Sequence, residues 1–211
     1  MNKITGTITI TSAGVTLNGK QRIANSENLP FGKLCRKIYK ELAIEYPKFY
    51  KMDGMSKLGF LAAEMLLAQT DFLSRYDAER IGVITTTQTG CFETDKKFAK
   101  TIEKAGEWYP APALFVYTLP NIVTGEICIR HKISGENCCF VHEKISSETV
   151  VNYTTHLFDD KKIDAALVGI IEQRAEYFYA IFYTVEGGEA VKKSDFKIET
   201  VDNEWREVCE S

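Results

Sequence analysis

The chain of 211 residues is long enough for one large domain, and its composition, 45% hydrophobic and 26% charged, is that of an ordinary globular protein. The formal net charge of −3 gives no electrostatic reason to expect nucleic acid or an anionic membrane surface as a partner. No apolar run approaches the roughly 18 residues that a membrane span requires, and the N-terminus lacks the apolar core of a signal peptide. We therefore expect a single cytoplasmic domain over residues 1–211.

Six cysteines are scattered along the chain, and no two of them form a C-x-x-C pair. The pattern predicts neither a zinc site nor a disulfide framework, and we expect no metal or other cofactor. The adjacent pair Cys138 and Cys139 would point to opposite faces of a strand, which makes joint metal binding difficult. The six are Cys35, Cys91, Cys128, Cys138, Cys139 and Cys209.

The first part of the chain predicts two extended pieces followed by a helix. Residues 3–10 alternate apolar residues with polar ones and predict a strand, and residues 15–20 predict a shorter extended piece with an Asn-Gly turn. Apolar residues at helical spacing predict a helix from Phe31 to about Tyr46, where Pro47 ends it.

The next part predicts a helix, a strand and a second helix. Asp53 is placed to cap a helix over 54–69, since apolar residues recur on one face of that segment at three- and four-residue steps. Residues 81–87, IGVITTT, predict a strand buried inside a sheet. Residues 94–108 predict a solvated amphipathic helix, and prolines follow it.

Residues 119–171 organise the prediction. They predict a short helix, a turn at 135–137, a buried strand, a sharp bend, a second helix and another buried strand. Many α/β enzymes place a nucleophile at such a bend. Two further strands are predicted over 176–185 and 195–201, joined through a Gly-Gly pair. The whole order predicts one α/β domain with a mostly parallel central sheet, helices on both faces and an antiparallel addition at the C-terminal end.

Five segments, in this order, resemble the N-terminal half of the β-ketoacyl synthases, the condensing enzymes of the thiolase fold: KITGTITITSAGVTLNG, MDGMSKLGFLAAEMLL, ERIGVITTTQTG, LPNIVTGEICIRHKISGEN and KKIDAALVGIIE. The fourth resembles the helix and turn that lead to the nucleophile strand, with Glu136 where proline is usual. The fifth resembles the Asp-x-Ala-Leu-Val-Gly-Gly strand that follows the nucleophile helix. The resemblance covers residues 3 to about 172 and depends on the order of the segments. It implies a thiolase-like half-fold.

The resemblance also implies a cysteine nucleophile at a helix N-terminus, where the helix dipole and backbone amides favour the thiolate. Counting at the family's spacing, forward from Asn137 and backward from Asp164, gives the same position, Lys144. A lysine cannot carry a thioester, and we interpret Lys144 as a solvent-exposed side chain near the first helical turn. Cys138 and Cys139 are the alternative nucleophiles, but they lie inside the predicted strand. We therefore assign no catalytic residue.

The histidines and serines of this region give no better catalytic assignment. The family's C-terminal histidines have no counterpart here, because the three histidines are His131, His142 and His156 and the chain has about half the length of a complete synthase. We interpret these three as structural, surface or interface side chains. Ser146 and Ser147 lie near the same turn, but no G-x-S-x-G elbow surrounds them.

The first functional hypothesis is a catalytically silent, ketosynthase-like accessory subunit of a fatty acid, polyketide or aryl-polyene-type assembly system. Family dimers pair through the strand that precedes the nucleophile, here residues 138–143. The resemblance therefore implies a homodimer, or a heterodimer with a full-length ketosynthase, with acyl carrier protein as a further partner. A half-fold would also leave open an apolar face that normally packs on the other half.

Two alternatives belong to other functional classes. The chain would be an enzyme if a partner chain completed its active site, as an acyl carrier protein-dependent 3-oxoacyl synthase or acyltransferase. It would be a small-molecule sensor if it kept only the acyl pocket of the family, although no particular residue indicates this.

Overall fold

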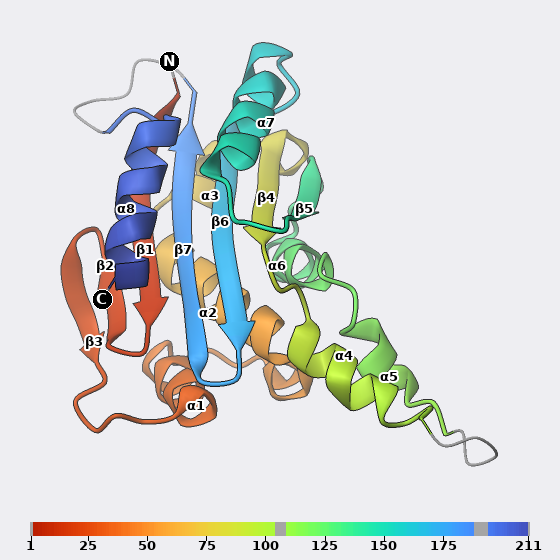
Figure 1. The fold of residues 1–211 in the computed structure, drawn as a ribbon. Helices are drawn as coiled ribbons and strands as arrows, with labels where there is room; N and C mark the ends of the chain where they lie inside the picture. The colour runs from red at the N-terminus through yellow and green to blue at the C-terminus, as the bar shows by residue number, and fades with distance from the viewer. Residues whose placement is uncertain (1, 104–108, 188–193, 211) are drawn as a thin grey trace.

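The computed structural model describes residues 2–103, 109–187 and 194–210. The end of the helix predicted over 94–108 and the second glycine of the predicted Gly-Gly connection lie outside these described residues. The described part of the chain is built from strands β1 to β7 and helices α1 to α8, with two short 3₁₀ turns (Figure 1).

One mixed sheet contains all seven of these strands, in the order β3-β2-β1-β7-β6-β4-β5 (Figure 1). β4 pairs in parallel with β5 and with β6, and the other neighbours pair antiparallel. Through these pairings β1, β3, β4, β5 and β6 run in one direction, whereas β2 and β7 run in the other. The strands are β1 Lys3–Thr11, β2 Gly14–Leu17, β3 Lys20–Ala24, β4 Ile81–Thr87, β5 Asn137–Val141, β6 Ala165–Arg174 and β7 Tyr177–Glu186.

Helices cover both faces of the sheet, as predicted. On one face α1, α2 and α6 pack on the sheet around one apolar cluster, and on the other face α7 and α8 pack around a second (Figure 1). The predicted α/β class with a mostly parallel sheet is therefore confirmed. The helices are α1 Phe31–Glu41, α2 Gly54–Leu67, α3 Phe72–Arg75, α4 Phe92–Ala99, α5 Pro112–Val116, α6 Ile122–His131, α7 Ser147–Asp159 and α8 Ile198–Glu210, with 3₁₀ turns η1 Pro47–Lys51 and η2 Ala78–Arg80.

The antiparallel strand predicted near the C-terminal end is β7, but it lies inside the sheet. β7 pairs with β6 in a hairpin whose turn is Ala175 and Glu176, and on its other side it pairs with β1. Ala175 takes the left-handed conformation (φ 53°) that so short a turn needs. Apart from the residue beside this turn, both strands are buried along their full length. β7 thus joins the N-terminal hairpin to the parallel strands.

The strand predicted over 195–201 is wrong. Asp195 makes a single bridge to Lys3, and helix α8 begins at Ile198. β-branched residues suggested a strand, but Val201 is fully buried while Trp205 and Val208 are partly buried at four- and three-residue steps along the helix. The helical period of the apolar residues outweighs their individual strand propensity.

The expectation of an open apolar face is also wrong. α8 lies over β1 and β7, beside α7, which lies over β4 and β6 (Figure 1). Phe196 and Val201 are buried there against β-strand residues such as Tyr183. Among the residues of α7 and α8 whose side chains are described, no large hydrophobic residue is exposed. The chain therefore covers this face with its own C-terminal helix.

Asp53 caps α2, as predicted. Its carboxylate accepts hydrogen bonds from the backbone N–H groups of Ser56 (2.9 Å) and Met55 (3.3 Å), two of the donors that a helix start leaves unpaired. Other boundaries differ from the prediction, since the first helix ends at Glu41 and η1 follows separately. The strand β3 and the short helices α3 and α5 were not predicted.

Glu186 anchors the end of β7 to the segment after α2. Both of its carboxylate oxygens pair with the Arg75 guanidinium (2.5 and 2.9 Å), and the Tyr76 hydroxyl donates to one of them at 2.6 Å. Burial by itself would raise the pKa of Glu186, but hydrogen bonds from Arg75 and other donors outweigh burial and lower this pKa to about 2. The ionised carboxylate is therefore part of the folded state.

We expect the substitution Glu186→Gln to lower the free energy of unfolding at neutral pH by about 1–3 kcal/mol, because it leaves Arg75 without its buried partner. The pKa of Glu186 is depressed on folding, so its stabilisation is complete above the unfolded value. It is lost as pH falls from 4.5 toward about 2. Urea unfolding of both proteins across this pH range measures the difference, which should shrink on acidification. Asp71→Asn is the matched control, since Asp71 pairs with the same Arg75 but is 71% exposed, and it should change stability little. A difference that grows on acidification would contradict this account.

Candidate functional site

The strand–bend–helix segment predicted from the sequence is present, with β5, a bend over 142–146 and α7 in succession. The turn before β5 needs glycine at Gly135, because a Cβ atom there would lie 2.4 Å from the backbone oxygen of Ile81. The start of β6 is fixed by Asp164, whose carboxylate pairs with the Arg80 guanidinium at 2.8 and 2.9 Å. Two strands that flank β4 are thereby held in register with it.

Lys144 lies in the bend, three residues before the first helical residue, Ser147. Its side chain is exposed, and Ser146 at the cap position makes no side-chain hydrogen bond to the helix. Ser147 is buried, and its hydroxyl donates to the Asp202 carboxylate of α8. The residues at the start of α7 therefore hold the two helices together, and none of them presents a thiol to solvent.

A buried carboxylate fixes the neighbouring loop, and the sequence reasoning missed it. Glu172 near the end of β6 accepts hydrogen bonds from the hydroxyls of Thr87 (3.0 Å) and Thr89 (2.6 Å) and from the backbone N–H of Gln88. The end of β4 also contacts the bend, since the His142 backbone N–H donates to the backbone carbonyl oxygen of Thr87 at 3.1 Å. The sequence signal for this contact was a glutamate at the end of an apolar strand. A carboxylate buried there needs several hydrogen-bond donors, which predicts a polar loop beside it.

The three histidines lie on different elements and share no site. His131 ends α6 and contacts the Glu64 carboxylate of α2 at 2.9 Å. His156 is largely exposed on α7, 3.3 Å from Asp160. His142 is half-buried in the bend, and its ring lies 6.0 Å from that of Phe140. The structure therefore assembles no histidine pair.

Cys138 and Cys139 point to opposite sides of β5, as expected for neighbours in a strand. Cys139 packs against the cluster under α2 and α6, while Phe140 packs against the cluster under α7. Burial raises the pKa of both thiols, and for Cys139 a hydrogen bond with Thr85 opposes this only in part. A raised pKa reduces the thiolate fraction, so we expect neither sulfur to be activated as a nucleophile.

β5 is an edge of the sheet. It pairs with β4 on one side, and within the described residues no strand pairs with its outer edge. β5, α6 and α5 lie on the same side of the molecule (Figure 1), and these elements and the turn between α5 and α6 carry exposed apolar side chains. They are Val141 (55% exposed), Ile129 (64%), Phe115 (52%), Val116 (46%) and Leu119 (44%). We call β5 and these side chains the β5 edge surface.

The described residues also bear on metals and membranes. Across the three described ranges, no group of three or more His, Cys, Asp or Glu side chains is arranged to hold a metal ion. Within the same ranges, none of the helices combines the length and apolar character that crossing a membrane requires.

The fold can now be compared with known proteins. No protein-family model matches the chain, and no curated protein sequence matches it. Solved structures do. The ishigamide ketosynthase/chain length factor matches 91% of this chain with a TM-score of 0.66 at 19% sequence identity, and 63% of that chain is covered. The chain has the fold of the ketosynthases.

Three further ketosynthase structures give the same result. The ketosynthase ApeO in complex with its chain length factor ApeC from Xenorhabdus doucetiae has a TM-score of 0.56 and 12% identity, over 89% of this chain and 79% of that one. The AntDE:AntF complex, a type II acyl-carrier protein with its ketosynthase, has a TM-score of 0.62 and 14% identity over 88% and 62%. A β-ketoacyl synthase from Burkholderia phymatum has a TM-score of 0.60 and 13% identity over 89% and 59%.

The chain thus spans less than two thirds of three of these four neighbours, 63%, 62% and 59% of their lengths. The resemblance to the thiolase-fold condensing enzymes that the sequence indicated is confirmed at the level of the fold. The low identities place no catalytic residue on this chain.

We expect the five described cysteines of the folded chain to react slowly with iodoacetamide at neutral pH. Burial raises the pKa of all five described thiols, and only the thiolate reacts. Peptide mapping of the alkylated protein should show Cys138 and Cys139 labelled more slowly than in the urea-unfolded chain, with the buried Cys35 and Cys91 slowest. If Cys138 or Cys139 reacted faster folded than unfolded, the conclusion that neither is activated would be wrong.

Proposed function

We propose that this chain is a non-condensing, ketosynthase-like subunit that joins a full-length ketosynthase through the β5 edge surface. The observation that carries the proposal is an unpaired sheet edge with exposed apolar side chains beside it. A free edge strand pairs readily with another strand, and proteins that stay monomeric usually protect such edges with charge or short length. The residues of β5, NCCFV, include no charged side chain.

The neighbours in structure support a ketosynthase as the partner. Two of them are ketosynthases with a chain length factor, and one is a ketosynthase complex with an acyl-carrier protein. These are statements about those proteins, and they support an analogous role here: an accessory subunit in a fatty acid, polyketide or aryl-polyene-type pathway. A second copy of this chain is the other partner that the same edge would accept, because antiparallel pairing of identical strands gives a two-fold symmetric dimer.

Catalytic silence is part of the proposal. The bend between β5 and α7 carries no cysteine, Lys144 is exposed there, and the thiols of Cys138 and Cys139 are made less reactive by burial. The subunit would then act by shaping or stabilising its partner rather than by forming an acyl-enzyme.

The first prediction concerns assembly. Size-exclusion chromatography with light scattering should show the chain as a dimer, or as a heterodimer when mixed with a full-length ketosynthase from the same organism. Val141→Lys should weaken this association about tenfold or more, because a lysine on the edge must be desolvated when a strand pairs there. Tyr177→Lys is the matched control, since Tyr177 is 58% exposed but belongs to the β6–β7 hairpin, and it should leave assembly unchanged. A chain that stays monomeric and binds no ketosynthase would refute the proposal.

The second prediction concerns chemistry. Incubation with an acyl thioester should give no stable acyl adduct by intact mass, while a full-length ketosynthase in the same assay is acylated on its cysteine. This separates the proposal from the alternative that a partner completes an acyltransferase site in this chain. An adduct that disappears in Cys138→Ala or Cys139→Ala would establish that alternative instead.

A further inference from the structure

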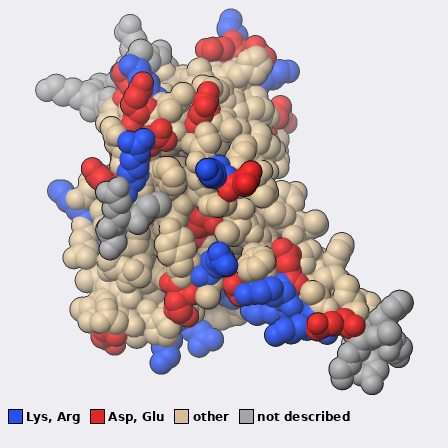
Figure 2. Space-filling view, in the orientation of Figure 1, with Lys and Arg blue, Asp and Glu red and all other residues tan. Residues whose placement is uncertain are grey.

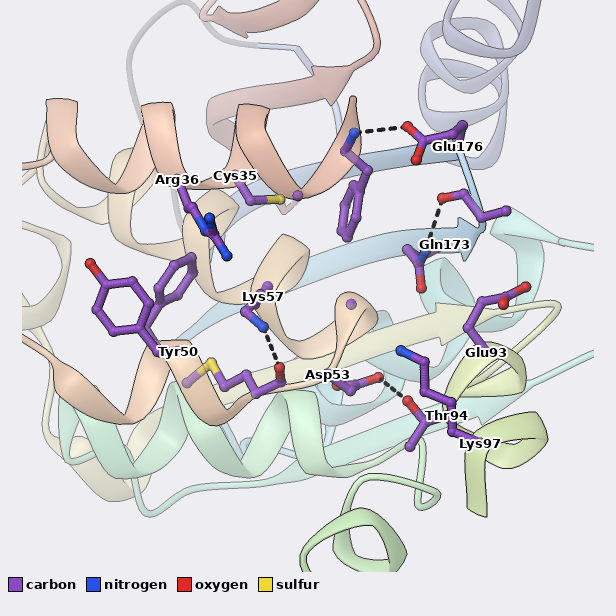
Figure 3. Close-up of a pocket in the computed structure, with 16 residues that line it drawn as sticks. Cys35, Arg36, Tyr50, Asp53, Lys57, Glu93, Thr94, Lys97, Gln173 and Glu176 are labelled. Carbon is purple, nitrogen blue, oxygen red and sulfur yellow. Dashed lines mark hydrogen bonds between the residues drawn. The ribbon is translucent and has the colours of Figure 1, made fainter. Parts of the chain in front are cut away.

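A cavity of about 370 Å³ lies at the carboxyl end of β6, apart from the β5 edge surface. Its walls come from the first turns of α1 and α2, from η1 between them, from α4 and from the turn between β6 and β7 (Figure 3). This volume is within the range of about 300–1,000 Å³ that small-molecule sites occupy. The assembly proposed for the β5 edge surface does not involve the residues of this cavity.

The three carboxylates that line the cavity are all engaged within the protein. Asp53 caps α2, and the Thr94 hydroxyl donates to it at 3.5 Å. Glu93 pairs with Lys96 at 2.8 Å. Glu176 accepts from the backbone N–H of Phe31 at 2.8 Å, at the start of α1. Their charges remain, but their oxygens accept from groups other than Arg36, Lys57 and Lys97.

The three cations that line the cavity, Arg36, Lys57 and Lys97, have no carboxylate partner among the residues the structure describes. Lys57 donates to the backbone oxygen of Met52 at 2.5 Å, a neutral partner. For Arg36 and Lys97, no ion pair with a carboxylate occurs among the residues the structure describes. Figure 3 shows Arg36 and Lys97 on either side of Lys57. Burial is the largest cause that lowers the pKa of Lys57; Cys35 and Asp53 oppose it, and the charges of Lys97 and Arg36 lower this pKa by smaller amounts. Three cations and three carboxylates thus line the cavity, and the carboxylates have partners of their own.

Basic side chains also lie on the surface beside the cavity. Figure 2 shows basic side chains gathered over α4, the helix that carries Lys97. Lys96, the neighbour of Lys97, points its charge to Glu93 and to the Phe92 ring rather than into the cavity. Lys96 is therefore not among the three cations that line the cavity.

Aromatic and apolar side chains form the remaining wall. Phe49 is fully buried and stacks on Tyr39 with ring centroids 4.2 Å apart, so its position is rigid. Met52 is buried beside it, and Tyr50 is 59% exposed at the entrance. A ligand that filled the cavity would place a charged group among the cations and an apolar part on this wall.

We propose that this cavity binds a small molecule with one carboxylate or phosphate group and a compact apolar part, its anion held by Arg36, Lys57 and Lys97. This site is independent of the assembly proposed for the β5 edge surface. It requires no second chain and no covalent step.

Isothermal titration calorimetry of the whole chain tests the proposal with three anions: benzoate, hexanoate and inorganic phosphate. Benzamide is the neutral counterpart of benzoate. We expect saturable, one-site binding of at least one anion and none of benzamide. Arg36→Gln and Lys97→Gln should each weaken anion binding about tenfold, the usual effect of losing one charge-assisted hydrogen bond. Lys33→Gln is the matched control, since Lys33 is exposed on α1 and does not line the cavity, and it should bind as the unmodified chain does.

Comparison of the carboxylates with phosphate also identifies the charged group of the ligand. Saturable binding of benzoate or hexanoate without phosphate supports a carboxylate ligand, and the reverse supports a phosphate ligand. Because Arg36 and Lys97 are exposed, we expect the variants Arg36→Gln and Lys97→Gln to keep the fold. No saturable binding of any of the three anions would overturn the proposal, as would equal weakening by Lys33→Gln. Either result would leave the proposed assembly untouched, since that is read from molar mass.

Discussion

The burial of β6 and β7 on both faces is the constraint on which the rest of the structure depends. Apart from the residue beside their turn, both strands are shielded from water along their whole length, so each face of the sheet needs a layer of helices. On one face α2 supplies this layer with α1 and α6. On the other face α7 and α8 share it, and α8 covers β1 and β7, which α7 does not reach (Figure 1).

This arrangement changes where a partner would bind. An open apolar face would have made the sheet surface the association site, but α8 turns polar residues such as Asn203 and Glu207 to solvent there. What stays open is the edge at β5, where the hydrogen-bonding groups of the strand have no partner strand within the described residues. Backbone groups exposed in this way favour another strand, and the apolar residues of α5 and α6 extend the surface beyond the strand itself.

The carboxyl ends of the strands carry two regions of different character. Beside β5 the bend is held by structural contacts, from Glu172 through Thr87 to His142 and from Ser147 to Asp202. Beside β6 the cavity has three cations around a space lined on one side by aromatic rings. The first region has the strand, bend and helix that the sequence predicted, with no cysteine in the bend, and the second is the cavity proposed to bind a small anion. The two proposals therefore concern separate parts of one sheet end.

The sequence by itself determined the elements whose signals are local. The period of two in residues 3–10, the cap at Asp53 and the β-branched run of β4 each act through neighbouring residues, and they predicted β1, α2 and β4. The order of five segments was enough for the fold. Tertiary structure alone decided that residues after 197 form a helix, that β7 lies inside the sheet, and that Glu172 and Glu186 are buried carboxylates with donors from distant segments. It also decided that Arg36, Lys57 and Lys97 meet around one cavity. Such features depend on contacts between residues far apart in the chain, where the stabilisation by burial and charge pairing exceeds the local preferences that a sequence pattern reports.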